Sequence, residues 1–183
     1  MPRASRLLLL LAIPLAWGCA ARTPPIDPAR AEDPEIRGIA RAFEATVQRL
    51  REDPDTHWHT GWTGNIAVHM LGANNKGLCH QWRDEVYTGV APTTRDLGWI
   101  ATTIVINWGD AGEHNAVVVY DPARWHRAPP LDEAPELGAY VLDAWRRGRA
   151  DIYTLRGWLS NQRHVTRAAE LVDPEQPRAV LSP

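Results

Sequence analysis

The apolar residues of the first half of the chain recur at helical spacing. Between Glu35 and Arg51 the recurring apolar positions are Ile36, Ile39, Ala40, Phe43, Val47 and Leu50. This spacing predicts an amphipathic helix that ends near Asp53-Pro54. A second helix is predicted from Leu78 to Tyr87. Its apolar positions fall at i, i+4 and i+8, and they are Leu78, Trp82 and Val86.

The segment between these helices has a less regular pattern. We interpret the His- and Trp-rich stretch His57–Trp62 as a loop and the short apolar stretch Asn65–Leu71 as helical. Gly72–Gly77 is rich in Gly and Asn, which predicts a turn or loop. Cys79 therefore lies in the first turn of a helix that follows a Gly/Asn loop.

The pattern changes to that of strands after Asp96. Trp99–Trp108 is rich in β-branched residues and is predicted to be a strand. Gly109–Gly112 is a predicted turn, and His114–Tyr120, with its fully apolar middle, is a second predicted strand. These two strands are expected to form a hairpin.

The last part of the chain is predicted to hold one more strand among irregular segments. Trp125–Gly138 contains three prolines and is expected to be irregular, and Ala139–Trp145 is the third predicted strand. Asp151–Leu159 is expected to form a helix or a turn. The 183 residues are enough for one domain. The order of elements predicts an α+β fold in which the Cys79 helix packs on a small antiparallel sheet.

The N-terminus has the pattern of an export signal. Arg3 and Arg6 precede the apolar stretch Leu7–Leu15, which is too short to span a bilayer of about 30 Å. The stretch continues into the sequence LAWGC, which ends at Cys19 and resembles the lipobox of bacterial lipoproteins. The resemblance implies that residues 1–18 are a signal peptide and that Cys19 carries a lipid.

Cleavage near Ala20 or Ala21 by ordinary signal peptidase is the alternative, and either route exports the protein. Ala20 directly after the cysteine favours an outer-membrane lipoprotein that faces the periplasm. Residues 19–34 are rich in proline and charge and are interpreted as the anchor cysteine and a tether. We expect the domain to span residues 35–172, followed by a proline-punctuated tail at 173–183.

Charge argues against a nucleic-acid partner. The net charge is −2, and the arginines do not form one long block, so the chain lacks the basic surface that nucleic acid requires. We expect a monomer without a cofactor. Its expected partners are a peptide or peptidoglycan-like substrate and, through Cys19, the membrane.

Cys79 stands out because processing at the N-terminus consumes or removes Cys19, the only other cysteine. Cys79 is then a lone thiol in an oxidising compartment, where a free cysteine is either buried or functional. A thiol becomes a good nucleophile as the thiolate, which a helix N-terminus or a neighbouring imidazolium can stabilise. His114 is the candidate base. Asp143, on the next predicted strand, can orient the imidazole if the two strands pair.

Three motifs resemble those of one enzyme family. They are GLCHQW at 77–82, EHNAVVVYDP at 113–122 and YVLDAW at 140–145. Together they resemble the Cys, His and Asp motifs of transglutaminase-like cysteine enzymes, which belong to the papain-like superfamily. The resemblance implies Cys79 as the nucleophile, His114 as the general base and acid, and Asp143 as the orienting carboxylate. His80 after the nucleophile, and Asn115 where the family has an aromatic residue, depart from the pattern and leave the substrate open.

The oxyanion hole has several candidate donors. The backbone N–H of Cys79 is one of them. A second could come from a side chain near the nucleophile, and the candidates are Trp62, Asn65, Asn74, Asn75 and Gln81. Asn74 and Asn75 are also explained as turn formers.

Four alternatives compete with this interpretation. Cys79 could be an inert core thiol, and Asp121 could replace Asp143 as the orienting acid. A metal site could draw on His57, His59, Cys79, His80 and His114, although these lack the familiar spacings of zinc ligands. The chain could also be a non-catalytic envelope lipoprotein that uses a degenerate enzyme fold to bind peptide or glycan.

The function that the sequence favours is that of an exported thiol-dependent hydrolase or acyltransferase. It would act on amide bonds in peptides or envelope crosslinks through an acyl-enzyme on Cys79. Hydrolysis and transfer to an amine use the same three residues and are not separated by the sequence.

Overall fold

The computed structural model of the chain describes residues 22–71, 74–110, 112–127, 129, 131–132, 134–162 and 169–172. The predicted signal peptide, Cys19 and the predicted tail at 173–183 lie outside the described residues. No helix in the described part of the chain is long and apolar enough to cross a lipid bilayer.

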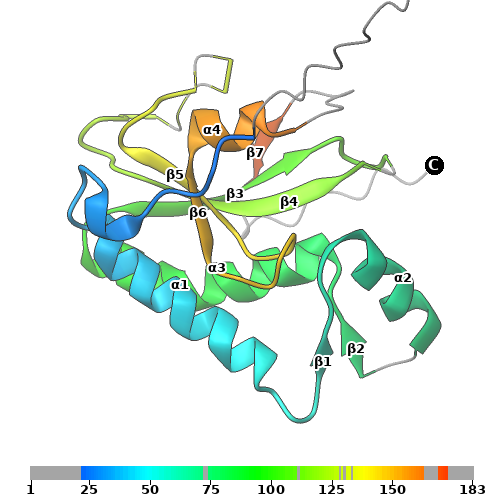
Figure 1. Cartoon of the computed structure of the whole chain (residues 1–183). Helices are drawn as coiled ribbons and strands as arrows, with labels where there is room; N and C mark the ends of the chain where they lie inside the picture. Colours follow the sequence, from blue (N-terminus) through cyan, green and yellow to red (C-terminus); the bar gives the residue numbers. More distant parts are fainter. Residues whose placement is uncertain are drawn as a thin grey trace, which may run out of the picture.

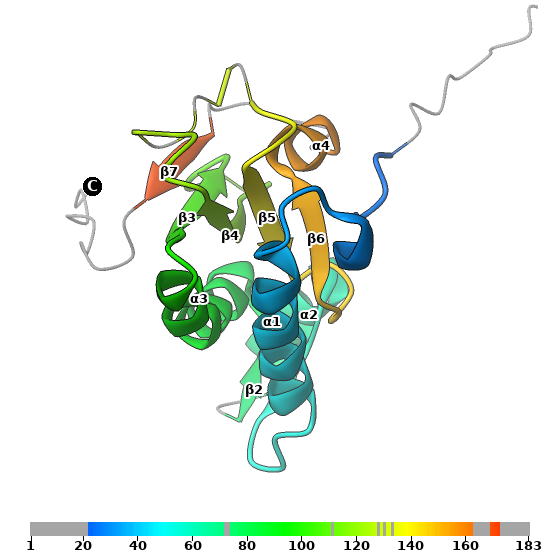
Figure 2. The same ribbon diagram turned by 90° about the vertical axis from the view of Figure 1, so that its left-hand side faces the viewer.

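Two long helices lie side by side on one face of a sheet (Figures 1 and 2). Helix α1 spans Ile36–Arg51, and α3 spans Cys79–Asp96. The apolar side of α1 is buried because its hydrophobic residues recur at helical spacing, as the sequence predicts. Helix α3 is longer than predicted. It continues past the predicted end at Tyr87, and at Gly89 it closely approaches the Thr46 side chain of α1.

The central sheet has five antiparallel strands in the order β6-β5-β4-β3-β7. The strands are β3 (Ile100–Ile106), β4 (His114–Tyr120), β5 (Ala139–Asp143), β6 (Asp151–Thr154) and β7 (Glu170–Val172). The predicted hairpin is confirmed, since Ile106 pairs with His114 across β3 and β4. Strand β5 pairs with β4, with Leu142 opposite Val117.

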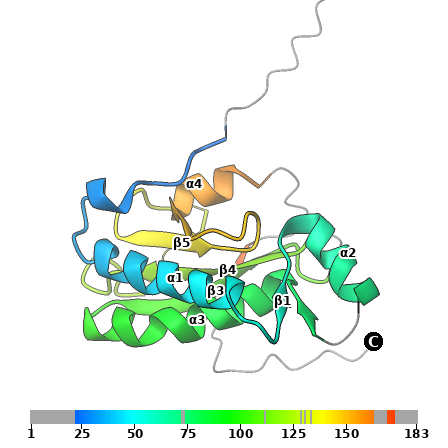
Figure 3. The same ribbon diagram turned by 60° about the horizontal axis from the view of Figure 1, so that its bottom comes forward.

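Both faces of the sheet are covered. Helices α1 and α3 cover one face, where Phe43, Trp82 and Val117 share a core. The short helix α4, Leu155–Ser160, covers the other face, where Trp158 packs with Val118 (Figure 3). The molecule is therefore a mixed α and β domain with a small antiparallel sheet, as the α+β prediction requires. Successive residues of β4 face opposite layers, which decides where its polar residues point.

A smaller unit lies beyond the N-terminus of α3 (Figures 1 and 3). It contains α2 (Gly61–Leu71) and the short parallel pair β1 (His57–Trp58) and β2 (Asn75–Lys76). The prediction of a loop over His57–Trp62 is wrong, because His57 pairs with Asn75 and α2 begins at Gly61. Helix α2 covers the predicted helical stretch.

Two other segments differ from expectation. Residues Asp151–Leu159 divide into strand β6 and helix α4, because Asp151–Thr154 pairs with the edge of β5. Strand β7 was not predicted, and its three residues are held by pairing with β3.

The predicted tether lies against the domain. The backbone N–H of Ile26 donates to the carbonyl of Ile152, and both backbone groups of Thr23 bond the Asn161 side chain. The Tyr140 hydroxyl donates to the buried Asp33 carboxylate at 2.6 Å. These bonds fix residues 23–33 on the surface of the sheet and α4, so this part of the chain is not a free linker.

Candidate active site

Cys79 is the first residue of α3, and the loop before it is tightly held. The side-chain oxygen of Gln81, Oε1, accepts hydrogen bonds from the backbone N–H groups of Gly77 and Leu78, at 2.9 and 3.1 Å. Trp145 donates from Nε1 to the Gly77 carbonyl at 2.8 Å. Gln81 of α3 and Trp145, which follows β5, therefore both hold the loop that leads into the helix. Cys79 has only 6% of its surface exposed.

His114 opens β4 and points to the α4 face of the sheet. Its ring stacks on Trp158 with centroids 5.4 Å apart and also contacts the Trp145 ring at 4.8 Å. Helix α3 packs on the opposite face of the sheet, but its first residue, Cys79, lies beside the start of β4. The Cys79 thiol lies 3.8 Å from the Glu113 carbonyl, next to His114 in the chain. The sulfur and the imidazole therefore lie at the same end of the sheet.

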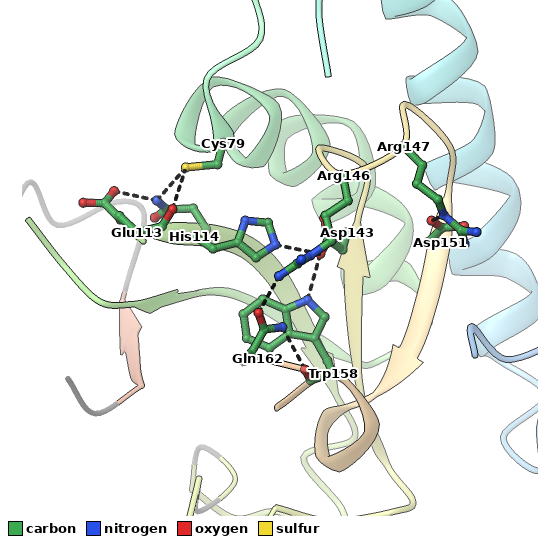
Figure 4. Close-up of polar contacts among 10 residues, drawn as sticks. Cys79, Glu113, His114, Asp143, Arg146, Arg147, Asp151, Trp158 and Gln162 are labelled. Atoms are coloured by element: carbon green, nitrogen blue, oxygen red, sulfur yellow. Dashed lines mark hydrogen bonds and ion pairs between the residues drawn. The ribbon is translucent and has the colours of Figure 1, made fainter. Parts of the chain in front are cut away.

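Asp143 is the last residue of β5, and its carboxylate bonds the imidazole. His114 Nε2 donates to Asp143 Oδ2 at 2.7 Å, and both side chains are nearly fully buried (Figure 4). Trp158 Nε1 donates to the same oxygen at 2.9 Å. Arg146 forms an ion pair with it at 3.5 Å. Three groups therefore hold one carboxylate oxygen.

Burial and charge act in opposite directions on this pair. Burial alone would lower the pKa of His114, but the Asp143 carboxylate and the neighbouring Cys79 side chain outweigh it, so the pKa is raised. Burial alone would raise the pKa of Asp143, but the His114 charge and the bonds from His114 and Trp158 outweigh it, so the pKa is lowered. The pair therefore favours an imidazolium beside a carboxylate.

The second ring nitrogen of His114 lies on the side that faces α3. Figure 4 shows the ring between the start of α3 and Asp143. His114 Nδ1 is buried and has no hydrogen-bond partner among the described residues. With the Nε2 proton held by Asp143, Nδ1 is the position that can exchange a proton with the Cys79 thiol.

Asn115 contacts the sulfur from the other face of β4. Its Nδ2 group lies 3.4 Å from Cys79 Sγ and 2.7 Å from Glu113 Oε1, and the residue is buried. Its carbonyl oxygen accepts a bond from Arg83 at 2.8 Å. Arginine can only donate and a carboxylate can only accept, so these two partners fix the orientation of the amide. An N–H of Asn115 is therefore directed at Sγ.

Cys79 opens into a surface groove of about 380 Å³. One wall comes from α2, with Trp62, Asn65 and Ile66. The other comes from the loop between β3 and β4, with Asp110 and Glu113. Three other grooves on the described surface do not include Cys79. The groove therefore connects the Cys79 side chain with the protein surface.

The structure separates the candidate oxyanion donors. Trp62 and Asn65 line the groove beside Cys79. The side-chain oxygen of Gln81 accepts a hydrogen bond from the loop before Cys79. The side-chain oxygen of Asn75 lies 2.8 Å from His59 Nε2. Asn74 lies in the turn before β2, and its backbone carbonyl accepts a hydrogen bond from the backbone N–H of His57. The first-turn N–H groups of α3, including that of Cys79, have no partner within the helix.

The alternative site residues lie elsewhere. Asp121 follows the far end of β4 from His114, where it accepts a bond from the Ala123 N–H in a turn and pairs with Arg124. Among the described residues, no three His, Cys, Asp or Glu side chains are grouped so that they could hold a metal ion. His59 is instead bonded to Asn75.

Three residues without a predicted role in the site complete it. Trp158 and Arg146 both hold Asp143, and Asn115 holds Cys79. Alternation along β4 predicts that Asn115 and His114 face opposite layers, but not that Asn115 contacts the Cys79 sulfur. Comparison of the chain with family models, curated proteins and solved structures finds no match.

Proposed function

We propose that this protein is a thiol-dependent hydrolase or acyltransferase that acts on amide bonds through an acyl-enzyme on Cys79, with a papain- or transglutaminase-like site. The main support is the buried His114–Asp143 pair, whose one unpartnered ring nitrogen lies beside a thiol at a helix N-terminus. An inert core cysteine has no need of an oriented, charge-stabilised imidazole next to it.

The first half of the reaction forms the acyl-enzyme. His114 Nδ1 takes the proton of the Cys79 thiol while Asp143 holds Nε2–H. The Asn115 N–H and the first turn of α3 stabilise the negative charge on Sγ. Sγ attacks the amide carbon, and the C–S bond forms. The oxyanion is stabilised by the Cys79 N–H.

The second half releases the product. The C–N bond breaks, and Nδ1–H of His114 protonates the departing amine. Water or a second amine then attacks the thioester, and His114 takes a proton from it. The C–S bond breaks, and His114 returns that proton to the departing sulfur, which restores the thiol. Because the same groups serve both acceptors, hydrolysis and transfer differ only in which acceptor reaches the thioester.

The proposed location of the protein limits the range of substrates that it would meet. We further propose that the protein is exported, carries a lipid on Cys19, and faces the periplasm from the outer membrane, near peptide and peptidoglycan-type crosslinks. This rests on the LAWGC sequence at residues 15–19 and the preceding apolar stretch.

An ester that releases a coloured alcohol tests the proposed function directly. In a Cys19→Ser background, Cys79 is the only thiol of the chain. Treatment with p-nitrophenyl acetate is expected to release a burst of about one nitrophenolate per protein and to leave one acetyl group on Cys79 by mass spectrometry. Cys79→Ala should show neither signal. A wild-type protein that shows neither would contradict the proposal.

A further inference from the structure

Helix α2 exposes an apolar ridge beside the Cys79 groove. Trp62, Ile66 and Met70 follow each other at i, i+4 and i+8, and their exposed fractions are 60%, 49% and 76%. Such spacing places them on one side of the helix. Trp62 and Ile66 also line the groove. The ridge is therefore continuous with the surface through which Cys79 is reached.

The opposite wall of the groove is acidic. Glu113 lies next to the site, and its two carboxylate oxygens accept from neutral donors, the Gly109 N–H and the Asn115 amide. No described residue forms an ion pair with Glu113. Asp110 lies in the same wall, and the lining also holds His69 and His80 but no lysine or arginine. The Glu113 carboxylate therefore places a negative charge at the groove, and none of the described residues neutralises it in an ion pair.

A buried group directed at the thiol marks this surface as a ligand site. His114 is 3% exposed, and its Nδ1 atom, on the side of the ring that faces α3, has no hydrogen-bond partner in the described part of the chain. An apolar wall, an acidic wall and a nucleophile between them are complementary to one kind of molecule. That molecule presents apolar surface to α2 and a positive charge to Glu113.

We propose that the groove binds amide substrates that carry an apolar side chain and a positively charged group near the scissile bond, and that it disfavours anionic ones. The apolar group rests on Trp62 and Ile66, and the cation faces Glu113. This inference rests on the proposed function. Substrate selection by the two walls is separable from the activation of the thiol, and the test uses that separation.

Charged thiol reagents measure the acidic wall without a known substrate. Methanethiosulfonates react when Sγ attacks the thio sulfur, a disulfide forms and methanesulfinate leaves. The full chain in the Cys19→Ser background is treated with trimethylammonioethyl, sulfonatoethyl and methyl reagents. The cationic reagent should react faster than the anionic one, and Glu113→Gln should lower that ratio on the order of tenfold. Added salt should reduce the wild-type ratio.

A matched variant separates the site from overall charge. Glu44 is exposed on α1, away from the groove residues, so Glu44→Gln changes the net charge equally. It should leave the ratio within about twofold of wild type. A ratio that is unchanged in Glu113→Gln, or changed equally by Glu44→Gln, would overturn the acidic-wall part of the proposal.

Apolar reagents measure the α2 wall. The rate with benzyl methanethiosulfonate divided by that with the methyl reagent should fall about fivefold in Trp62→Ala, because the ring loses its apolar contact. Leu137→Ala removes a comparably exposed apolar side chain outside the groove lining and should not change this ratio. An unchanged ratio in Trp62→Ala overturns the proposal. So does a Trp62→Ala effect confined to self-association or to binding of phospholipid vesicles, since a second copy or a membrane then occupies the ridge.

Failure of the proposed function gives a different result. If Cys79 is not activated, the neutral methyl reagent will react equally slowly with wild type and His114→Ala. The ratios between reagents divide out that common nucleophilicity, so they still report the selectivity of the groove.

Discussion

His114 and Asp143 lie diagonally across the paired strands β4 and β5, with Nε2 and Oδ2 2.7 Å apart. The β4–β5 register places Val117 opposite Leu142, and the two polar residues follow on the α4 face at the end of the pair. Diagonal neighbours on one face are within reach of an imidazole. The hydrogen bond therefore follows from strand register.

Loss of the Asp143 charge should destabilise the protein in a pH-dependent way. We expect Asp143→Asn to lower the free energy of unfolding by about 3 kcal/mol near pH 5, because it leaves a buried imidazolium without its partner. The pKa of Asp143 is lowered from 3.8, so its contribution is present above that pH and is lost as the pH falls through the lower folded value. Urea unfolding at a series of pH values measures the difference.

At high pH, the contribution of His114 to stability changes with pH in the opposite direction. The pKa of His114 is raised from 6.5, so its contribution is complete below 6.5 and is lost as the pH rises through the higher folded value. The difference between wild type and Asp143→Asn should therefore be greatest between about pH 3.8 and 6.5 and shrink on both sides. A difference that is constant with pH would show that the pair is not ionised in the folded protein.

Trp158→Phe should separate the hydrogen bond to Asp143 from the aromatic stack on His114. The variant keeps a ring against the imidazole but loses the Nε1 donor, so we expect a loss of stability of about 1–3 kcal/mol and slower acylation. Trp58→Phe is the control, because Trp58 Nε1 is buried and has no hydrogen-bond partner among the described residues. Equal losses of stability in the two variants would mean that the Trp158–Asp143 bond contributes nothing.

Asn115→Leu should slow the reaction of Cys79 without unfolding the protein. The variant keeps the size of the side chain but removes the N–H directed at Sγ, so we expect alkylation near pH 6 to fall by about threefold to tenfold. Asn74→Ala, in an exposed turn, should leave the rate unchanged. An Asn115→Leu protein that alkylates like wild type would show that the amide does not stabilise the thiolate.

Gly77→Ala should disturb the nucleophile through the loop that precedes it. Gly77 has a φ of 150°, and a Cβ there would clash with the His59 carbonyl. We expect a loss of more than about 2 kcal/mol and a slower Cys79 reaction. Gly98 also has a positive φ, of 77°, but its Cβ would meet open space, so Gly98→Ala should lose only about 1 kcal/mol. Similar losses at both positions would contradict the steric explanation.

The sequence predicted the elements that have a strong local pattern. The helix of α1, the β3–β4 hairpin and the strand β5 follow from helical spacing and β-branched runs. These patterns also put His114 and Asp143 on neighbouring strands. Strand β7 and the β1–β2 pair could not be predicted, because two- or three-residue strands are defined by partners far away in the chain.

In the site, too, features with a local sequence pattern could be predicted, and features that depend on distant contacts could not. Cys79 at a helix start was readable from the Gly/Asn loop and the spacing of Leu78 and Trp82. The contact from Asn115 was not, because it depends on the N-terminus of α3 ending beside β4. Thr23 and Asp33 bond residues more than a hundred positions away, which a proline-rich composition does not reveal.

The alkylation rate of Cys79 as a function of pH tests the central claim most directly. In the Cys19→Ser background, iodoacetamide rates are measured from about pH 5 to about pH 9 for wild type and His114→Ala. If His114 takes the thiol proton, wild type should alkylate readily near pH 6, and His114→Ala should be at least about tenfold slower there. If both proteins instead react only as the pH approaches the free-cysteine value of about 8.5, Cys79 is not an activated nucleophile.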